Sequence, residues 1–106
     1  MRPQDVVAPK WRWRLNRVLY VRPYADPDFA FAMALGLWEG EPVIACRWTG
    51  NLDDPDAKGM PISSGHAVWF VEDQENYEAL LLNPRISEED RRYARDFLGL
   101  DRAAAA

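Results

Sequence analysis

The sequence has little of the residue chemistry on which metal sites and covalent catalytic sites depend. Cys46 is its only cysteine and His66 its only histidine, so an intrachain disulfide and the common Cys/His zinc sites within one chain are excluded. It also contains no Gly-x-Gly-x-x-Gly stretch, no P-loop and no Gly-x-Ser-x-Gly elbow. The sequence therefore assigns no cofactor, no metal ligand and no catalytic residue.

Long apolar stretches are missing too. No run approaches the roughly 20 residues that cross a bilayer, and residues 1–10 lack the apolar stretch of a signal peptide. We therefore expect a cytoplasmic protein without a membrane partner. Lysine is scarce, since Lys10 and Lys58 are the only two among 13 basic residues. Such a preference for arginine is typical of GC-rich bacterial genomes.

Apolar and aromatic residues, by contrast, are abundant. The 106 residues are 48% hydrophobic and include five Trp, four Tyr and four Phe, which excludes a disordered chain and suffices for one domain. We expect this domain over residues 1–102, with 103–106 as an alanine tail added for expression. The aromatic excess indicates a protein interface or a ligand pocket, and an ordinary aromatic core is the alternative.

Charge is distributed unevenly along the chain, whose net charge is −4. Residues 1–25 carry six basic side chains and one acidic side chain, while the rest carries seven basic and sixteen acidic ones. The basic quarter is either a binding edge or a segment that pairs with the acidic remainder. We favour pairing, within the fold or across a homo-oligomer, because an acidic protein repels phosphates at long range.

Alternating side chains predict four strands, over residues 11–22, 28–38, 43–49 and 67–71. The first pattern places its apolar side chains on one face: Trp11, Trp13, Leu15, Leu19 and Val21. Large and small side chains alternate in the second, and its small face would admit a helix or a second sheet. A helix beginning after Asp26 and ending at Gly40 is the alternative for this segment. Cys46 should lie buried beside Ile44 and Trp48.

Two helices follow the strands. Asp73 can cap the first, and Asn83-Pro84 ends it. Ser87 and Asp90 resemble a capping box at the start of the second, and Gly99 ends it. The predicted fold is therefore α+β: an antiparallel sheet of about four strands, in the order β-β-β-loop-β, with two C-terminal helices packed on one face.

The polar loop over residues 51–65 is the predicted binding site, because binding residues concentrate in loops held by a rigid scaffold. Trp48 and Trp69 flank it and would supply an apolar wall. Asp54, Lys58, Ser63, Ser64 and His66 would supply polar groups. A mobile connector without a role is the alternative. The loop is not a calcium site, because Lys58 and Gly65 occupy EF-hand positions that require oxygen ligands.

Three functions remain open. The first is a non-catalytic binding or interaction module that self-associates. The second is a small hydrolase-like enzyme that uses the loop around His66, for which Cys46 and His66 would have to share a cleft. The third is a single-stranded nucleic-acid binder that uses the Trp/Arg alternation of residues 11–14. We favour the first, because strand geometry places Trp11 and Trp13 opposite Arg12 and Arg14.

Overall fold

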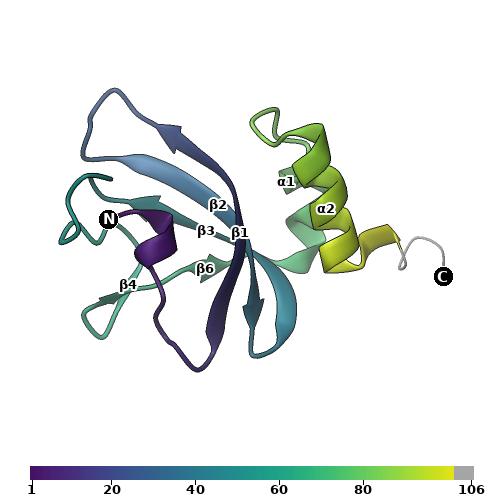
Figure 1. The fold of residues 1–106 in the computed structure, drawn as a ribbon, viewed down its shortest axis with the longest axis horizontal. Helices are drawn as coiled ribbons and strands as arrows, with labels where there is room; N and C mark the ends of the chain where they lie inside the picture. Colours follow the sequence, from purple (N-terminus) through teal and green to yellow (C-terminus); the bar gives the residue numbers. More distant parts are fainter. Residues whose placement is uncertain (102–106) are drawn as a thin grey trace.

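The structure, a computed structural model, describes residues 1–101. It confirms the predicted α+β class, with a four-stranded antiparallel sheet and C-terminal helices on one side of it (Figure 1). Across the sheet the strands are β1 (Trp13–Pro23), β2 (Ala30–Trp38), β3 (Glu41–Thr49) and β6 (Phe70–Val71). The end of the predicted domain at residue 102 and the alanine tail lie outside the described residues.

A continuous hairpin of β2 and β3 forms the centre of the sheet. The two strands pair without interruption from Ala30↔Thr49 to Trp38↔Glu41. The two residues of the turn, Glu39 and Gly40, have φ angles of 51° and 84°, which matches the twist of a tight hairpin. Residues 28–38 therefore contain a strand, as favoured over the helix, and β3 begins two residues before its predicted start at Val43.

The first strand differs from its prediction, because it begins at Trp13 and changes face along its length. Its pairing with β2 shifts between Leu15 and Arg17 and again between Val18 and Tyr20. Each β-bulge adds one residue to β1 and reverses the alternation that follows. Trp13 and Leu19, predicted to share a face, consequently lie in different cores.

The small face of β2 is covered by tryptophan side chains, where we expected a helix or a second sheet. Ala32, Ala34 and Gly36 lie on this face, against Trp13 and Trp69. A Cβ atom on Gly36 would lie 2.2 Å from Cη2 of Trp13. The indole therefore rests directly on the glycine backbone, and the small residues make room for large rings.

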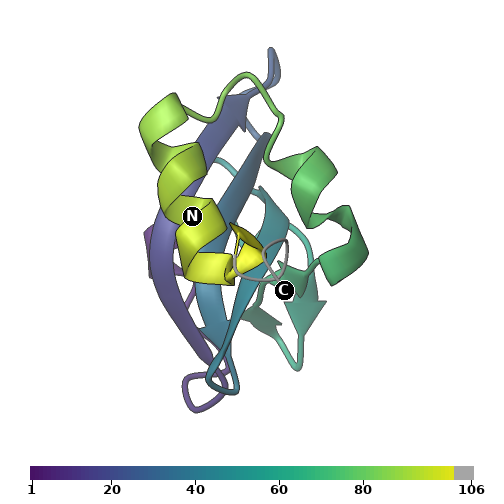
Figure 2. The same cartoon turned by 90° about the vertical axis from the view of Figure 1, so that its right-hand side faces the viewer.

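The helices cover the opposite face of the sheet (Figure 2). Asp73 caps a short 3-10 helix, and the Ser87 hydroxyl accepts a hydrogen bond from the backbone N–H of Asp90 at 3.0 Å. Gly99 ends the last helix in the left-handed conformation, as predicted. The elements are η2 (Gln74–Asn76), α1 (Tyr77–Leu80) and α2 (Glu88–Leu98). The helix-side core consists of Leu19, Met33, Leu35, Ile44, Tyr77, Leu81, Ile86 and Ala94.

The N-terminal segment covers the other face, a layer that the sequence did not indicate. It contains η1 (Pro3–Asp5), buried Val6 and a parallel bridge between Ala8 and Val68. Figure 1 shows this segment and the helices on opposite sides of the sheet. The N-terminal-side core consists of Val6, Trp13, Ala32, Ala34, Val43, Ala45, Ala67 and Trp69.

Residues 51–71 are more regular than expected. A second, two-stranded sheet pairs β4 (Ile62–Ser63) with β5 (His66–Ala67), so the predicted 15-residue loop is wrong in its last part. The predicted strand over residues 67–71 divides into β5 and β6, and only β6 joins the main sheet. Val68 and Trp69, between them, instead face the N-terminal segment.

Candidate functional site

The residues predicted to form one site do not come together. Trp69 is only 7% exposed and belongs to the N-terminal-side core. Its indole Nε1 donates to the carbonyl of Val6 at 3.1 Å, and its ring lies 5.6 Å from that of Trp13. Trp48 lies on the opposite, helix-side face, paired with Phe31. The two tryptophans therefore do not form a common wall.

The charged residues of the loop support its own backbone. Oδ1 of Asp54 accepts a hydrogen bond from the N–H of Asp56 at 2.9 Å, which stabilises a tight turn. The ammonium group of Lys58 donates to the carbonyl of Gly65 at 2.6 Å and links the loop to the β4–β5 turn. These contacts fix the shape of the loop, and the second one places the Lys58 ammonium at the residue that precedes His66.

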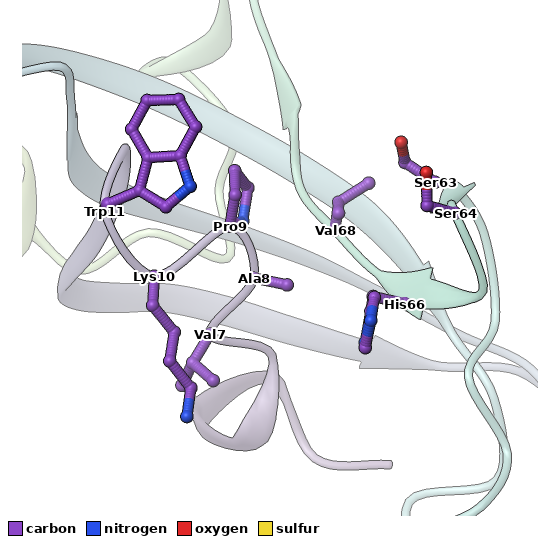
Figure 3. A pocket seen from close by; sticks show the side chains of 9 residues that line it. All are labelled: Val7, Ala8, Pro9, Lys10, Trp11, Ser63, Ser64, His66 and Val68. Carbon is purple, nitrogen blue, oxygen red and sulfur yellow. The ribbon is translucent and has the colours of Figure 1, made fainter.

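A groove beside the N-terminal segment contains the remaining predicted residues, and Figure 3 shows it. The Trp11 ring lies at one end and His66 at the other, while the hydroxyls of Ser63 and Ser64 point away from the imidazole. The groove encloses about 410 Å³ and is lined by Val7, Ala8, Pro9, Lys10, Trp11, Ser63, Ser64, His66 and Val68. No carboxylate or thiol lines the groove, so His66 has no orienting acid there, and the hydroxyls of Ser63 and Ser64 are not directed at its ring.

A second hollow, on the helix side of the sheet, is markedly aromatic. Strand register builds it, because residues directly opposite each other in a sheet point to the same face. Phe31 lies opposite Trp48, Trp48 opposite Met60, and Phe70 opposite Cys46. Trp48, Met60 and Phe70 are 41%, 62% and 57% exposed, because α1 and α2 cover only the other end of this face. We call Tyr24, Phe31, Trp48, Met60 and Phe70 the aromatic face.

The rings of the aromatic face hold one another at defined angles. Trp48 lies 5.3 Å from the Tyr24 ring at 41°, and 5.2 Å from the Phe31 ring at 73°. The Arg22 guanidinium stacks over Tyr24 at 4.6 Å from the ring centroid. Such tilted and edge-to-face pairs are favourable ring geometries. Tyr24, Phe31 and Trp48 are therefore held in place before any ligand arrives.

Between these rings lies a pocket of about 370 Å³, within the range of small-molecule sites. We call it the aromatic pocket; it is lined by Phe31, Cys46, Arg47, Trp48, Met60, Pro61, Phe70 and Glu72. Three aromatic rings and a thioether give it an apolar wall. Glu72 is the one acidic side chain in the lining.

Cys46 and Glu72 form a polar pair in this pocket. The Cys46 thiol is buried and donates to Oε1 of Glu72 at 3.0 Å. Burial first, and then the hydrogen bond and negative charge of Glu72, raise the pKa of Cys46 to about 12. The thiol therefore stays protonated at neutral pH, where a nucleophile would have to be a thiolate. Its burial was predicted, whereas the exposure of Trp48 on the same face was not.

Arg47 lines the pocket, but its guanidinium group points away from it. It is 1% exposed, and it lies opposite Ala32 of the N-terminal-side core. Its guanidinium donates to the carbonyls of Val68 and Lys58, while its Nε has no partner among the described residues. Burial lowers the pKa of Arg47 to about 10, so it stays charged at neutral pH. Arg47 thus ties the segments that carry Met60 and Phe70 to the sheet.

Sequence reasoning missed Phe31, Met60, Phe70 and Glu72. Phe31 was predicted only as one of the large side chains of its strand, and only the length of the helices shows that this end of the face is open. Met60 lies in the loop, and its bridge to Trp48 depends on a long-range backbone pairing. The alternation of Phe70 and Glu72 next to buried Trp69 was a usable signal, because period two places them together on one face.

No protein family model matches the chain, and no curated protein or solved structure is similar to it. None of the helices in residues 1–101 has the length and apolar character needed to span a membrane. Within the same residues, no three His, Cys, Asp or Glu side chains gather in a way that could hold a metal ion.

Proposed function

We propose that this protein is a non-catalytic binding module whose ligand occupies the aromatic pocket. The observation that carries the proposal is the exposure of Trp48, Met60 and Phe70 side by side around a hollow. Full burial of such a side chain contributes about 1.5–3 kcal/mol. A monomeric protein that leaves several of them together in water therefore forgoes stability, and contiguous apolar patches of this kind are typical of interaction sites.

The chemistry of the two hollows supports binding over catalysis. Cys46 lines the aromatic pocket and His66 lines the groove beside the N-terminal segment. A Cys–His dyad needs both groups within hydrogen-bond reach. The high pKa of Cys46 also removes the thiolate on which covalent chemistry would depend.

A fluorescent apolar probe tests this proposal. Phenylnaphthylamine is neutral and brightens when it leaves water, so we expect saturable binding to the native protein. Trp48→Ala should weaken that binding about tenfold, because it removes the central ring of the pocket. Trp11→Ala is the matched control, since Trp11 is 76% exposed and lies at the other groove. Equal effects of the two substitutions, or no saturable binding at all, would refute the proposal.

Single-stranded nucleic acid is a second candidate ligand, for a different surface. Trp11 is exposed, and the Arg12 guanidinium lies 4.1 Å from its ring centroid. Both residues line a hollow with Arg14, an arrangement that suits base stacking and phosphate contacts. Trp13 is buried, so only Trp11 of the two tryptophans in residues 11–14 is available for base stacking. Tryptophan quenching by oligothymidylate, lost in Trp11→Ala and weakened by salt, is the expected result; no quenching would exclude this candidate.

Two further expectations belong to the proposal. The first is a cytoplasmic location, in which Cys46 would remain a thiol. Self-association agrees with the uneven charge of the chain, whose first 25 residues are basic and whose remainder is acidic. Immunofluorescence or fractionation of the tagged protein tests the first, and secretion of the protein would contradict it.

A further inference from the structure

The aromatic pocket combines aromatic rings with one acidic side chain, and this combination has a charge preference. Its rings come from Phe31, Trp48 and Phe70, and its carboxylate from Glu72. The one basic residue in the lining, Arg47, directs its guanidinium to carbonyls on the other side of the sheet. The open volume is therefore bounded by aromatic rings and a negative charge.

Glu72 has no cationic partner within the described chain. In residues 1–101 the ion pairs involve other carboxylates, such as Asp90 with Arg17 and Glu78 with Arg95. The thiol of Cys46 holds Oε1 of Glu72 in position at 3.0 Å. A carboxylate that is partly buried, oriented and without a counter-charge favours a cation beside it.

The rings can supply the rest of a cation site. Phe31 and Trp48 contact each other edge to face, at 73°, and both line the pocket. Arg22 already lies over Tyr24, and at 5.9 Å from the centroid of Phe31, which is the distance range of cation–π attraction. Arg22 occupies the β1 edge of the aromatic face, whereas Glu72 lies beyond β3, at the β6 edge. The negative end of the face is the end that holds the pocket.

The aromatic pocket has few hydrogen-bond acceptors in its lining, and this limits which cations it can bind well. A primary ammonium carries three N–H donors and a guanidinium five, and each loses free energy when it leaves water without acceptors. Glu72 is the only charged acceptor in the lining. A trimethylammonium group has no N–H donor, and its methyl groups pack against rings while its charge is attracted to them.

We propose that the aromatic pocket binds a small molecule through a trimethylammonium group, with Phe31, Trp48 and Phe70 as its walls and Glu72 as its counter-ion. This proposal rests on the proposed function, because it names the ligand class of the same pocket. A small molecule is favoured over a macromolecule by the size of the pocket, about 370 Å³.

The test compares choline with dimethylbutanol, the neutral molecule in which a tert-butyl group replaces the trimethylammonium group. Both are titrated into the full chain while NMR follows the indole N–H of Trp48. We expect choline to bind about tenfold more tightly than dimethylbutanol, as the strength of desolvated cation–π contacts predicts. Glu72→Gln, whose amide oxygen can still accept from Cys46, should reduce this preference to a few-fold.

A second pair of variants separates ring electrostatics from apolar bulk. Phe70→Leu keeps an apolar side chain and removes the ring, so choline affinity should fall several-fold while phenylnaphthylamine still binds. Leu82→Ala, at an exposed position outside the pocket, should change neither. Equal affinities of the wild-type chain for choline and dimethylbutanol would overturn the cation proposal and leave the binding module intact. If choline has no effect on Trp48, the cation proposal also fails, and phenylnaphthylamine binding decides separately whether the binding module survives.

Discussion

Cysteine is a reactive residue type, but the surroundings of Cys46 make its thiol unreactive. An ordinary thiol has a pKa of 9.0, and burial together with Glu72 raises that of Cys46 to about 12. At pH 8 the thiolate fraction is then lower by a factor on the order of 10³. We predict that a disulfide reagent labels the native protein about a thousandfold more slowly than the denatured chain. Comparable rates in the two states would show that the thiol is accessible and ionised.

The same pKa carries a consequence for stability. Because the folded-state pKa of Cys46 lies above the unfolded one, folding retains a proton that the unfolded chain releases first. The contribution is fully present below pH 9 and is lost as pH rises toward 12. Tyr20 and Tyr77 have their pKa values raised by burial as well, so they act in the same direction at high pH.

Gly36 is required by the ring that lies on it. A Cβ there would meet Cη2, Cζ3 and Cζ2 of Trp13 at 2.2–2.7 Å. We predict that Gly36→Ala lowers the free energy of unfolding by about 1–3 kcal/mol, the usual cost of overpacking. These contact atoms belong to the outer ring of the indole, which Phe lacks. Trp13→Phe should therefore lose less stability in the Gly36→Ala background than in the wild type, and additive losses in urea unfolding would contradict the contact.

At the scale of elements, α2 depends on the residue that caps its N-terminus. The Ser87 hydroxyl accepts from the N–H of Asp90, while the Asp90 carboxylate pairs with Arg17 of β1 at 2.9 Å. We predict that Ser87→Ala costs about 1 kcal/mol of unfolding free energy, as loss of an N-cap does. Ser63→Ala, at an exposed position, should stay within about 0.5 kcal/mol. Urea unfolding measures both, and equal losses would contradict a capping role.

The sequence was most informative where structure is local. The β2–β3 turn, the Ser87 cap and the Gly99 stop depend on a few neighbouring residues, and all three were predictable. The bulges of β1 were not, because they satisfy packing on both faces of the sheet at once. The binding site was predicted wrongly for a related reason. Phe31 and Phe70 look like core residues in the sequence, and their exposure follows only from where α1 and α2 end.

At the scale of the whole molecule, the uneven charge of the chain predicts self-association. The chain has a mass of 12.2 kDa, and we expect light scattering at high micromolar concentration to give about twice that value. In a symmetric pair the basic residues 1–25 of each copy would face acidic residues of the other, and the aromatic face would stay open. A mass of 12.2 kDa across the concentration range would contradict the prediction.

The bond from the indole of Trp69 to the carbonyl of Val6 joins residues 63 positions apart. Contacts of this separation carry a large loop-closure entropy, whereas the β2–β3 hairpin closes through a two-residue turn. We therefore expect the hairpin to form before the N-terminal segment docks. Trp69→Phe should then accelerate unfolding about tenfold and leave the refolding rate nearly unchanged in stopped-flow measurements. The N-terminal segment would accordingly be the last part to dock on the Trp13 face of the sheet during folding and the first to leave it during unfolding.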